Sequence, residues 1–260
     1  MTSTVSRSPV GELLRQWRER RRISQLDLSI EADISTRHLS FVETGRSQPS
    51  RDMVLRLADS LDVPLRERNR LLLAAGYAPV YGEAPLSAPQ MAAVRQAIRL
   101  VLKAHEPFPA VVVDRAWNLV DANATLELLT AGADRRLLEP PVNVLRLALH
   151  PDGVAPRIVN LGEWRAHLLA RLRREIAASA DQRLIELLDE LREYPGDKPD
   201  IEVPGSGDVV VPLCIRTGVG ELRLLSTIAT FGTPLDVTVA ELSIESFFPA
   251  NPETAEALRS

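Results

Sequence analysis

The sequence predicts two units of different fold class: an all-α bundle of five short helices, then an α+β unit with a five-stranded antiparallel sheet. Three observations lead to this division. Residues 1–76 carry apolar side chains at helical spacing throughout. Residues 77–89 contain three prolines and a glycine and have no apolar period. In residues 90–260, strand-like runs at both ends enclose two long helical patterns, which is typical of an α+β domain.

The composition is that of an ordinary globular protein. Its 260 residues are 45% hydrophobic and 25% charged, enough to bury a core in one or two domains. Cys214 is the single cysteine, so no internal disulfide can form and a reducing compartment is expected. No apolar run approaches the roughly 20 residues that cross a bilayer, and no secretory signal is present. We therefore expect a cytoplasmic protein without a membrane partner.

The five helices of the first unit are expected over 9–22, 25–32, 36–44, from Pro49-Ser50 onward, and over 65–75. Ser24 and Ser35 can cap the second and third helices, because a serine hydroxyl accepts a hydrogen bond from the first helical turn. Gly45 supplies the left-handed residue that ends the third helix. Short connections between such helices predict a compact bundle.

The charge is unevenly distributed between the two units. Residues 1–82 hold 13 arginines against 10 acidic residues, a balance of +3. The remainder has 18 basic and 25 acidic residues, a balance of −7, which together give the net charge of −4. This asymmetry favours a DNA-contacting segment joined to an acidic one.

The second unit is expected to begin with a helix and two strands that enclose a turn at 115–117. Asn123 is expected to cap the helix that follows the second strand. Helices between the early and the late strands would cover one face of the sheet. The expected helices are 88–104, 124–130, 157–178 and 181–194, and the expected strands are 110–114, 118–121, 209–215, 221–231 and 239–248.

Residues 24–46, SQLDLSIEADISTRHLSFVETGR, resemble the helix-turn-helix of the XRE family, which contains the phage repressors and Cro. The likeness continues through QPS at 48–50 and LADSLDVP at 57–64, so it spans the whole bundle. Two residues depart from the family pattern. Ser29 occupies the position in the second helix where the family usually has a small residue, and Asp33 occupies the position of the turn glycine. Asp tolerates the left-handed conformation better than most residues. The resemblance implies a lambda repressor-like DNA-binding domain over 1–76.

The third helix carries the residues expected to read DNA bases. At 100° per residue, Leu39 and Val42 turn inward, while Thr36, Arg37, Ser40 and Phe41 form an outward stripe. In a major groove, Arg37 can bind guanine O6 and N7 and Phe41 can contact thymine methyls. The alternative is that Phe41 packs on the fourth helix and Arg37 is only solvated. The DNA-binding candidates around this helix are Ser35, Thr36, Arg37, Ser40 and Phe41.

Other residues are expected to position the domain on the DNA backbone. Gln25 matches the family position that contacts phosphate, and Arg46 and Ser47 follow the third helix as further backbone contacts. The resemblance also implies a structural ion pair between Arg18 and Glu43. Because one such domain touches few base pairs, we expect a homodimer on double-stranded DNA with an inverted-repeat operator.

Residues 108–118, FPAVVVDRAWN, and 143–146, NVLR, with a tryptophan-bearing helix at Trp164, resemble the MmyB-like subgroup of XRE regulators. The strand, turn, strand and Asn-led helix is similar to the opening of a PAS-type sensor domain. The resemblance implies a PAS-like regulatory and dimerisation domain over 90–260, after a linker at 77–89. It also implies a small apolar ligand of the fatty-acid type. The late strand VPLCIR at 211–216 departs from the His-Pro-x-x-Gly pattern common in the family, so the ligand can differ.

Candidate ligand-binding residues follow from which side chains the sheet and helices turn toward each other. The apolar candidates would line the pocket, and the cationic ones could meet a ligand carboxylate. The alternative for each apolar residue is an ordinary core position, and for Arg171 a solvated helix face. The candidates are Val113, Trp117, Leu119, Arg157, Trp164, His167, Leu168, Arg171, Ile228 and Phe231.

The sequence has no recognisable catalytic or metal-binding motif. Its four histidines are scattered and lack metal-ligand spacing, and no nucleotide-binding glycine motif or nucleophile elbow occurs. We therefore expect no enzyme, no metal and no cofactor other than a fatty-acid-like ligand. The favoured hypothesis is a ligand-responsive transcription regulator. The alternative is a DNA-binding adaptor whose second domain docks a partner protein and binds no small molecule.

Overall fold

The computed structural model describes residues 10–195 and 210–259. The chain divides into two compact units: residues up to Ala84 with Leu235–Val237 form the first, and Pro85–Pro234 with Thr238–Ser260 form the second. The division falls inside the stretch 77–89 where the sequence predicts a linker. The first residues of the helix expected over 9–22 and of the strand expected over 209–215 lie outside the described residues.

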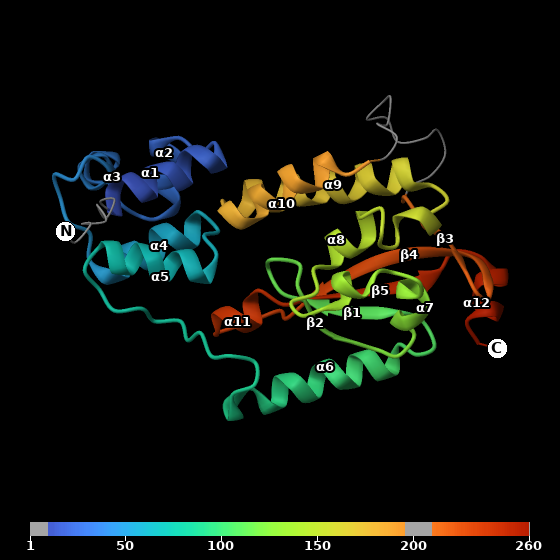
Figure 1. Ribbon diagram of the computed structural model, residues 1–260. Helices are drawn as coiled ribbons and strands as arrows, with labels where there is room; N and C mark the ends of the chain where they lie inside the picture. The colour runs from blue at the N-terminus through green and yellow to red at the C-terminus, as the bar shows by residue number, and fades with distance from the viewer. Residues whose placement is uncertain (1–9, 196–209, 260) are drawn as a thin grey trace, which may run out of the picture. The chain divides into compact units, whose positions relative to one another are not determined.

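The first unit contains the five predicted helices (Figure 1). Ser24, Ser35 and Ser50 each precede a helix, and each hydroxyl accepts a hydrogen bond from the backbone N–H three residues on, at 3.1 to 3.3 Å. These caps fix where the second, third and fourth helices begin. The helices are α1 Val10–Arg21, α2 Gln25–Glu31, α3 Thr36–Glu43, α4 Arg51–Ser60 and α5 Leu65–Ala74.

Two local features bring these helices together. Asp33 has φ +52°, so the residue that replaces the family's turn glycine adopts the left-handed conformation predicted for it. Gly11 lets α1 approach the end of α3, since a Cβ there would lie 2.1 Å from the carbonyl oxygen of Val42. The core between the helices is made of Leu14, Leu28, Leu39, Val42, Val54, Leu57, Leu71 and Leu72, each at most 1% exposed.

A bidentate ion pair connects α1 to the end of α3, as the resemblance implied. Arg18 Nε and Nη2 donate to the two carboxylate oxygens of Glu43 at 2.7 and 3.0 Å. Gln25 Nε2 donates to Glu43 Oε2 at 2.7 Å, and Arg18 Nη1 donates to the carbonyl of Ile23 at 3.0 Å. The Glu43 side chain is 1% exposed, so this network is a buried link between α1, α2 and α3.

The second unit is built on the predicted five-stranded antiparallel sheet, with strand order β2-β1-β5-β4-β3 (Figure 1). One row of side chains across the sheet pairs Val111 of β1 with Glu245 of β5, and Glu245 with Ile228 of β4. The strands are β1 Ala110–Val113, β2 Leu119–Ala122, β3 Leu213–Thr217, β4 Gly220–Thr230 and β5 Ser243–Pro249.

Helices of the second unit pack on both faces of the sheet. The larger core lies between one face and the helices α7 to α10, and it includes Trp117, Trp164 and Phe247. On the other face, Ile98 and Leu102 of α6 pack against alternate residues of β1 and β5. The helices are η1 Pro89–Met91, α6 Ala92–Ala104, α7 Leu126–Thr130, η2 Arg135–Leu138, α8 Val144–Leu149, η3 Ala155–Arg157, α9 Leu161–Ser179, α10 Gln182–Glu193, α11 Val237–Ala240 and α12 Pro252–Ala257.

Three expectations for the second unit are wrong. The sheet is covered on both faces, because α6 packs against it. The strand expected over 239–248 begins at Ser243, and residues before it form the short helix α11. Asn123 does not cap α7: its side chain accepts from Ala110 N at 3.0 Å and donates to Phe108 O at 2.7 Å, which joins the two ends of the β1–β2 hairpin.

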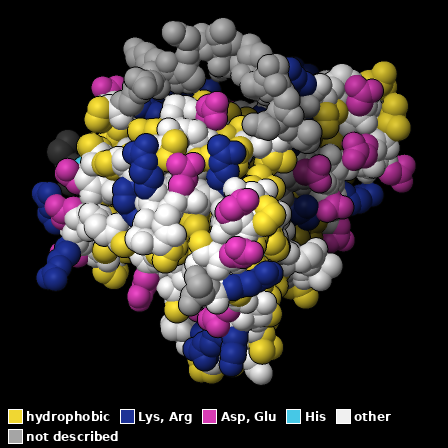
Figure 2. Space-filling view, turned by 90° about the vertical axis from the view of Figure 1, so that its right-hand side faces the viewer, with side chains coloured by type: hydrophobic (Ala, Val, Ile, Leu, Met, Phe, Trp, Pro, Cys, Tyr) yellow, Lys and Arg dark blue, Asp and Glu magenta, His cyan; other side chains and the backbone are white. Residues whose placement is uncertain are grey.

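Charged side chains of both signs are interspersed over the face that carries β3 and α12 (Figure 2). No described helix is long and apolar enough to cross a membrane. Within 10–195 and 210–259, no group of three His, Cys, Asp or Glu side chains is placed to hold a metal ion.

The buried pair predicts unequal effects of substitution. Glu43→Ala leaves Arg18 buried without its partner, and this is expected to lower the free energy of unfolding of the helical unit by about 3 kcal/mol. The double variant Arg18→Met/Glu43→Leu is expected to lose clearly less, because no uncompensated charge remains. Urea unfolding followed by circular dichroism measures both.

Arg15→Ala is the matched control, since Arg15 pairs with Glu19 on the surface, where both side chains are more than half exposed. Such pairs contribute about 0.2 to 1 kcal/mol. A Glu43→Ala protein no less stable than Arg15→Ala would show that the buried network is not a structural link.

Candidate functional site

The outward stripe of α3 lies where the helical period predicts it. Leu39 and Val42 are buried in the core of the first unit, whereas Arg37 is exposed. Thr36, Ser40 and Phe41 are partly exposed on the same side of the helix. Phe41 is not fully buried in the unit, so α3 presents polar, cationic and aromatic side chains together.

Phe41 is flanked by two arginines. The guanidinium of Arg37 lies 5.4 Å from the ring centroid and that of Arg46 lies 6.0 Å from it. Cation–π attraction at these distances holds both cations beside the ring. The backbone N–H groups of Arg46 and Ser47 both donate to the carbonyl of Phe41, at 2.8 and 3.1 Å, which ties the following turn to the helix. The arrangement places an apolar ring beside two guanidinium groups, each of which can donate two parallel hydrogen bonds.

The remaining DNA-binding candidates take part in contacts within the protein. Ser35 is exposed and caps α3. Thr36 Oγ1 lies 2.8 Å from Ser29 Oγ, a hydrogen bond that joins α2 to α3. Gln25 points its amide nitrogen at Glu43, so this amide is oriented by the buried ion pair. The Thr36 and Gln25 hydrogen bonds fix the position of α3 relative to α2.

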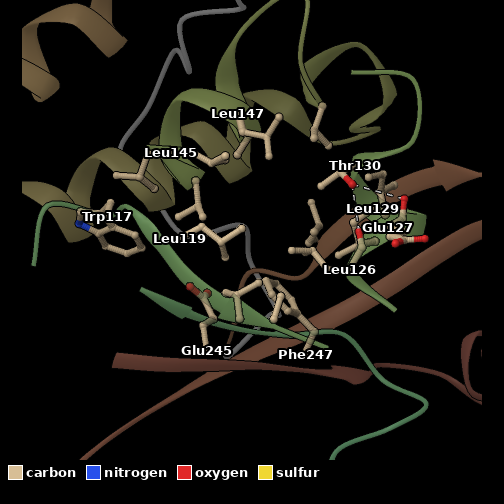
Figure 3. Close-up of a pocket in the computed structure, with 18 of the residues that line it drawn as sticks. Trp117, Leu119, Leu126, Glu127, Leu129, Thr130, Leu145, Leu147, Glu245 and Phe247 are labelled. Carbon is tan, nitrogen blue, oxygen red and sulfur yellow. Dashed lines mark hydrogen bonds between the residues drawn. The ribbon is translucent and has the colours of Figure 1, made fainter. Parts of the chain in front are cut away.

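A cavity of about 410 Å³ lies in the second unit, between the sheet and the helices α7, α8 and α9 (Figure 3). This volume falls within the range of about 300–1,000 Å³ typical of small-molecule sites. Most of its wall is aliphatic or aromatic, and the exposed residues Ala124, Glu127 and Leu138 mark where it reaches solvent. The wall includes Trp117, Leu119, Leu145, Trp164, Leu168 and Phe247.

Four of the ten predicted ligand-binding residues line this cavity, namely Trp117, Leu119, Trp164 and Leu168. The turn before β2 places Trp117. Asp114 Oδ1 accepts the backbone N–H groups of Ala116 and Asn118 at 2.8 and 2.9 Å, and Trp117 takes φ +65°. This left-handed conformation is uncommon for a large residue, and it directs the indole into the core.

The three other apolar candidates do not line the cavity. Val113 is buried in the same core but does not line the cavity. Ile228 of β4 pairs with Glu245 of β5. The described helices do not cover this part of β4, and Ile228 is 46% exposed. Phe231 packs with the cluster on the α6 face of the sheet.

The three cationic candidates also lie outside the cavity wall, contrary to the expectation. Arg157 donates to the carbonyl of Leu129 at the end of α7, and burial lowers its pKa. His167 stacks on Trp164 with ring centroids 5.3 Å apart, and burial lowers its pKa as well. Arg171 is buried behind the wall rather than on a solvated face.

Arg171 belongs to a polar network beside the cavity in which Arg171 and Glu245 are buried and Glu175 is partly exposed. Its guanidinium lies 4.1 Å from the centroid of the Trp117 ring, and Nη1 donates to Glu245 Oε2 at 3.1 Å. Trp117 Nε1 donates to Glu175 Oε2 at 2.8 Å. Burial raises the pKa of the Glu175 carboxyl above its ordinary value, and the nearby Arg171 cation only partly opposes this. The network fixes the orientation of the indole in the wall.

Sequence reasoning missed several lining residues. Leu145 and Leu147 lie on α8, whose signal was a leucine-rich run after Asn143, and the Asn143 side chain does accept from Arg146 N at 3.1 Å. Glu245 and Phe247 alternate along β5 on the cavity side. The strand period could have found this pair, because residues two apart on a strand face the same side of the sheet.

Comparison with known families matches residues 94–260 to the MmyB-like transcription regulator ligand binding domain, and residues 9–71 to a helix-turn-helix domain. The first match covers more than half of the chain, which therefore belongs to the MmyB-like family of transcription regulators. With its helix-turn-helix domain, the protein is a DNA-binding transcription regulator. Both matched families are regulatory domains and not enzymes.

None of the curated proteins matches the chain. A similar solved structure is described as "Structure of an RNA-binding Light-Oxygen-Voltage Receptor", with 16% sequence identity and a TM-score of 0.28. The alignment covers 99% of this chain and 64% of that one, so this chain spans less than two thirds of that protein's length. A likeness at this TM-score is too weak to support conclusions about fold or function.

The raised pKa of Glu175 predicts a pH-dependent stability. A carboxyl with a raised folded-state pKa stabilises the fold most when protonated, below its unfolded-state pKa of about 4.3, and this stabilisation is lost as pH rises through the folded-state pKa. Glu175→Gln keeps an acceptor for Trp117 without the charge. The variant is therefore expected to gain stability relative to the natural protein as pH rises from about 4 to about 8.

Urea unfolding across this pH range measures the difference, with Glu186→Gln as the control, because Glu186 is exposed on α10. A Glu175→Gln curve that stays parallel to that of the natural protein would contradict a raised pKa of this carboxyl.

Proposed function

We propose that this regulator binds an inverted-repeat operator as a homodimer and that a small apolar ligand in the second unit controls its affinity for DNA. The observation that carries the DNA-binding part is Phe41, kept at the surface of α3 between two arginines. A partly exposed aromatic ring with two cations beside it suits a major groove, where the base edges, with their thymine methyls and guanine acceptors, lie between two phosphate backbones.

Each residue of the surface has a distinct proposed role. Arg37 binds guanine O6 and N7, and Phe41 contacts a thymine methyl. Arg46 and Ser47, in the turn after α3, contact the DNA backbone together with Gln25, while Ser35, Thr36 and Ser40 complete the outward surface. One helix-turn-helix unit over 1–76 contacts a single half-site, so two copies are needed for an operator with half-sites about one helical turn apart.

The cavity supports the ligand-binding part of the proposal. Its 410 Å³ and largely apolar wall suit a fatty-acid-like chain. Ligand would shift the equilibrium between two arrangements of the protein by its difference in affinity for them. The second candidate function, an adaptor that docks a partner protein and binds no small molecule, would not need an open, apolar cavity of this size.

The base-reading role of α3 predicts the effect of Arg37→Ala. Loss of one bidentate guanine contact is expected to weaken binding to the selected operator by about 1–3 kcal/mol, roughly 5- to 150-fold. Weak binding that depends steeply on salt concentration should remain, since the phosphate contacts are unchanged. The operator is first obtained by selecting bound fragments from random DNA. Fluorescence anisotropy with specific and scrambled duplexes, at several salt concentrations, then measures the specific affinity and the residual salt-dependent binding.

Arg99→Ala is the control, because Arg99 is an exposed arginine of α6 in the second unit. Retention of full specificity by Arg37→Ala would rule out the proposed role of α3.

The ligand-binding role predicts the effect of filling the cavity. Ala148 of α8 lines the wall, so Ala148→Phe is expected to reduce binding of a fluorescent apolar probe at least tenfold. Ala93→Phe, at an exposed position of α6, should leave probe binding unchanged. Mass spectrometry of an organic extract of the purified protein should show a co-purifying apolar molecule. A protein that binds no probe and yields no such molecule would favour the adaptor.

A further inference from the structure

The charged groups of the cavity wall are all carboxylates. Among the described residues that line the cavity, Glu127 and Glu245 carry charge, and no lysine, arginine or histidine contributes to the wall. The two acids come from different parts of the wall: Glu245 lies between Trp117 and Phe247, whereas Glu127 lies beside Leu126 and Thr130 with its carboxylate turned away from the cavity (Figure 3). A ligand inside the cavity therefore meets the Glu245 side chain and not the Glu127 carboxylate.

The nearby cations are engaged elsewhere. Arg171 Nη1 is bonded to Glu245, and the rest of its guanidinium lies over Trp117 and against Glu175. Arg157 donates to backbone carbonyls of Leu128, Leu129 and Arg216. His167 stacks on Trp164 from outside the wall. A ligand carboxylate would find no exposed cation in the cavity.

Glu245 is the buried one of the two acids. Its residue is 5% exposed, in the middle of β5, and it lines the cavity. Oε2 accepts from Arg171 at 3.1 Å, and no hydrogen bond within the described part of the chain engages Oε1. Asn123 and Thr130, the neutral polar residues of the wall, already use their side chains in bonds to the backbone. No fully buried side-chain atom of the described residues lacks a hydrogen-bond partner, so Glu245 Oε1 is accessible and is the acceptor in the wall that a ligand can reach.

The chemistry of this acceptor selects among ligand head groups. An ionised fatty acid placed here would lose its hydration and lie beside a like charge, and both effects are unfavourable. A hydroxyl group would donate to the carboxylate in a charge-assisted hydrogen bond, which is stronger than a neutral one. A chain without a donor would gain the apolar contacts alone.

We propose that the cavity takes an apolar chain with a hydroxyl head group, and that this hydroxyl donates to Glu245. This inference rests on the proposed ligand-binding function and refines it: the chain is that of a fatty acid, but the polar end is a neutral donor in place of a carboxylate. Specificity then lies in a residue of β5 that also holds Arg171 in place.

The test compares three probes that share one chain: dodecanol, dodecanoate and dodecyl methyl ether. Their dissociation constants for the full-length protein are measured by displacement of a fluorescent apolar probe, at a pH where dodecanoate is ionised. Dodecanol is expected to bind about tenfold or more tightly than the ether, because a hydrogen bond to a charged group contributes about 1.5–3 kcal/mol. It should bind more tightly than dodecanoate by at least the same factor.

Glu245→Gln is expected to reduce the preference for dodecanol over dodecanoate, whereas Glu186→Gln, at an exposed position of α10, should leave it unchanged. Dodecanoate binding most tightly, or all three probes binding equally, would overturn the proposal while leaving ligand binding itself intact. A preference abolished by Glu127→Gln and not by Glu245→Gln would also overturn it. If none of the probes binds, the proposed ligand-binding function fails as well. If Glu245→Gln does not fold, the relative affinities of the three probes for the natural protein still test the preference for a hydroxyl head group.

Discussion

The anchoring of α3 is the constraint on which the DNA-binding surface depends. Leu39 and Val42 are fixed in the core, and Glu43 is held in a bidentate bond to Arg18. A helix anchored along one side has no freedom to rotate about its axis, so the opposite side is fixed as well. The exposure of Arg37 and the position of Phe41 follow from contacts made by other residues of the same helix.

In the second unit, the alternation of side chains along the strands decides which face of the sheet each residue occupies. Alternation along β1 and β5 sends Val111, Glu245 and Phe247 to one face, and Val112 and Ile244 to the other. Helix α6 closes the second face, while α7, α8 and α9 cover the first without filling it. The space left between them is the cavity, and the one acid that the alternation brings into it, Glu245, gives its buried end a polar character.

Much of the first unit could be predicted from the sequence because its signals are local. These signals are the serine caps, the glycine after α3 and the helical period, and each depends on residues within a few positions of one another. The predicted helix ends agree with the observed ones within two residues. The second unit was harder. The apolar period identified Trp117, Leu119, Trp164 and Leu168 as facing inward, but it could not show where the covering helices end, so Ile228 was misplaced. Nor could it show that Arg157 and Arg171 are bonded inside the protein, because those partners are distant in sequence.

The outward side of α3 is proposed to lie in the major groove. A methylation interference experiment with dimethyl sulfate tests this placement most directly. The reagent methylates guanine N7 in the major groove and adenine N3 in the minor groove. We predict that methylation of specific guanines in each half-site blocks binding of the natural protein, and that Arg37→Ala loses sensitivity at one guanine per half-site. Interference confined to adenines, or guanine interference that is the same in Arg37→Ala, would contradict this account.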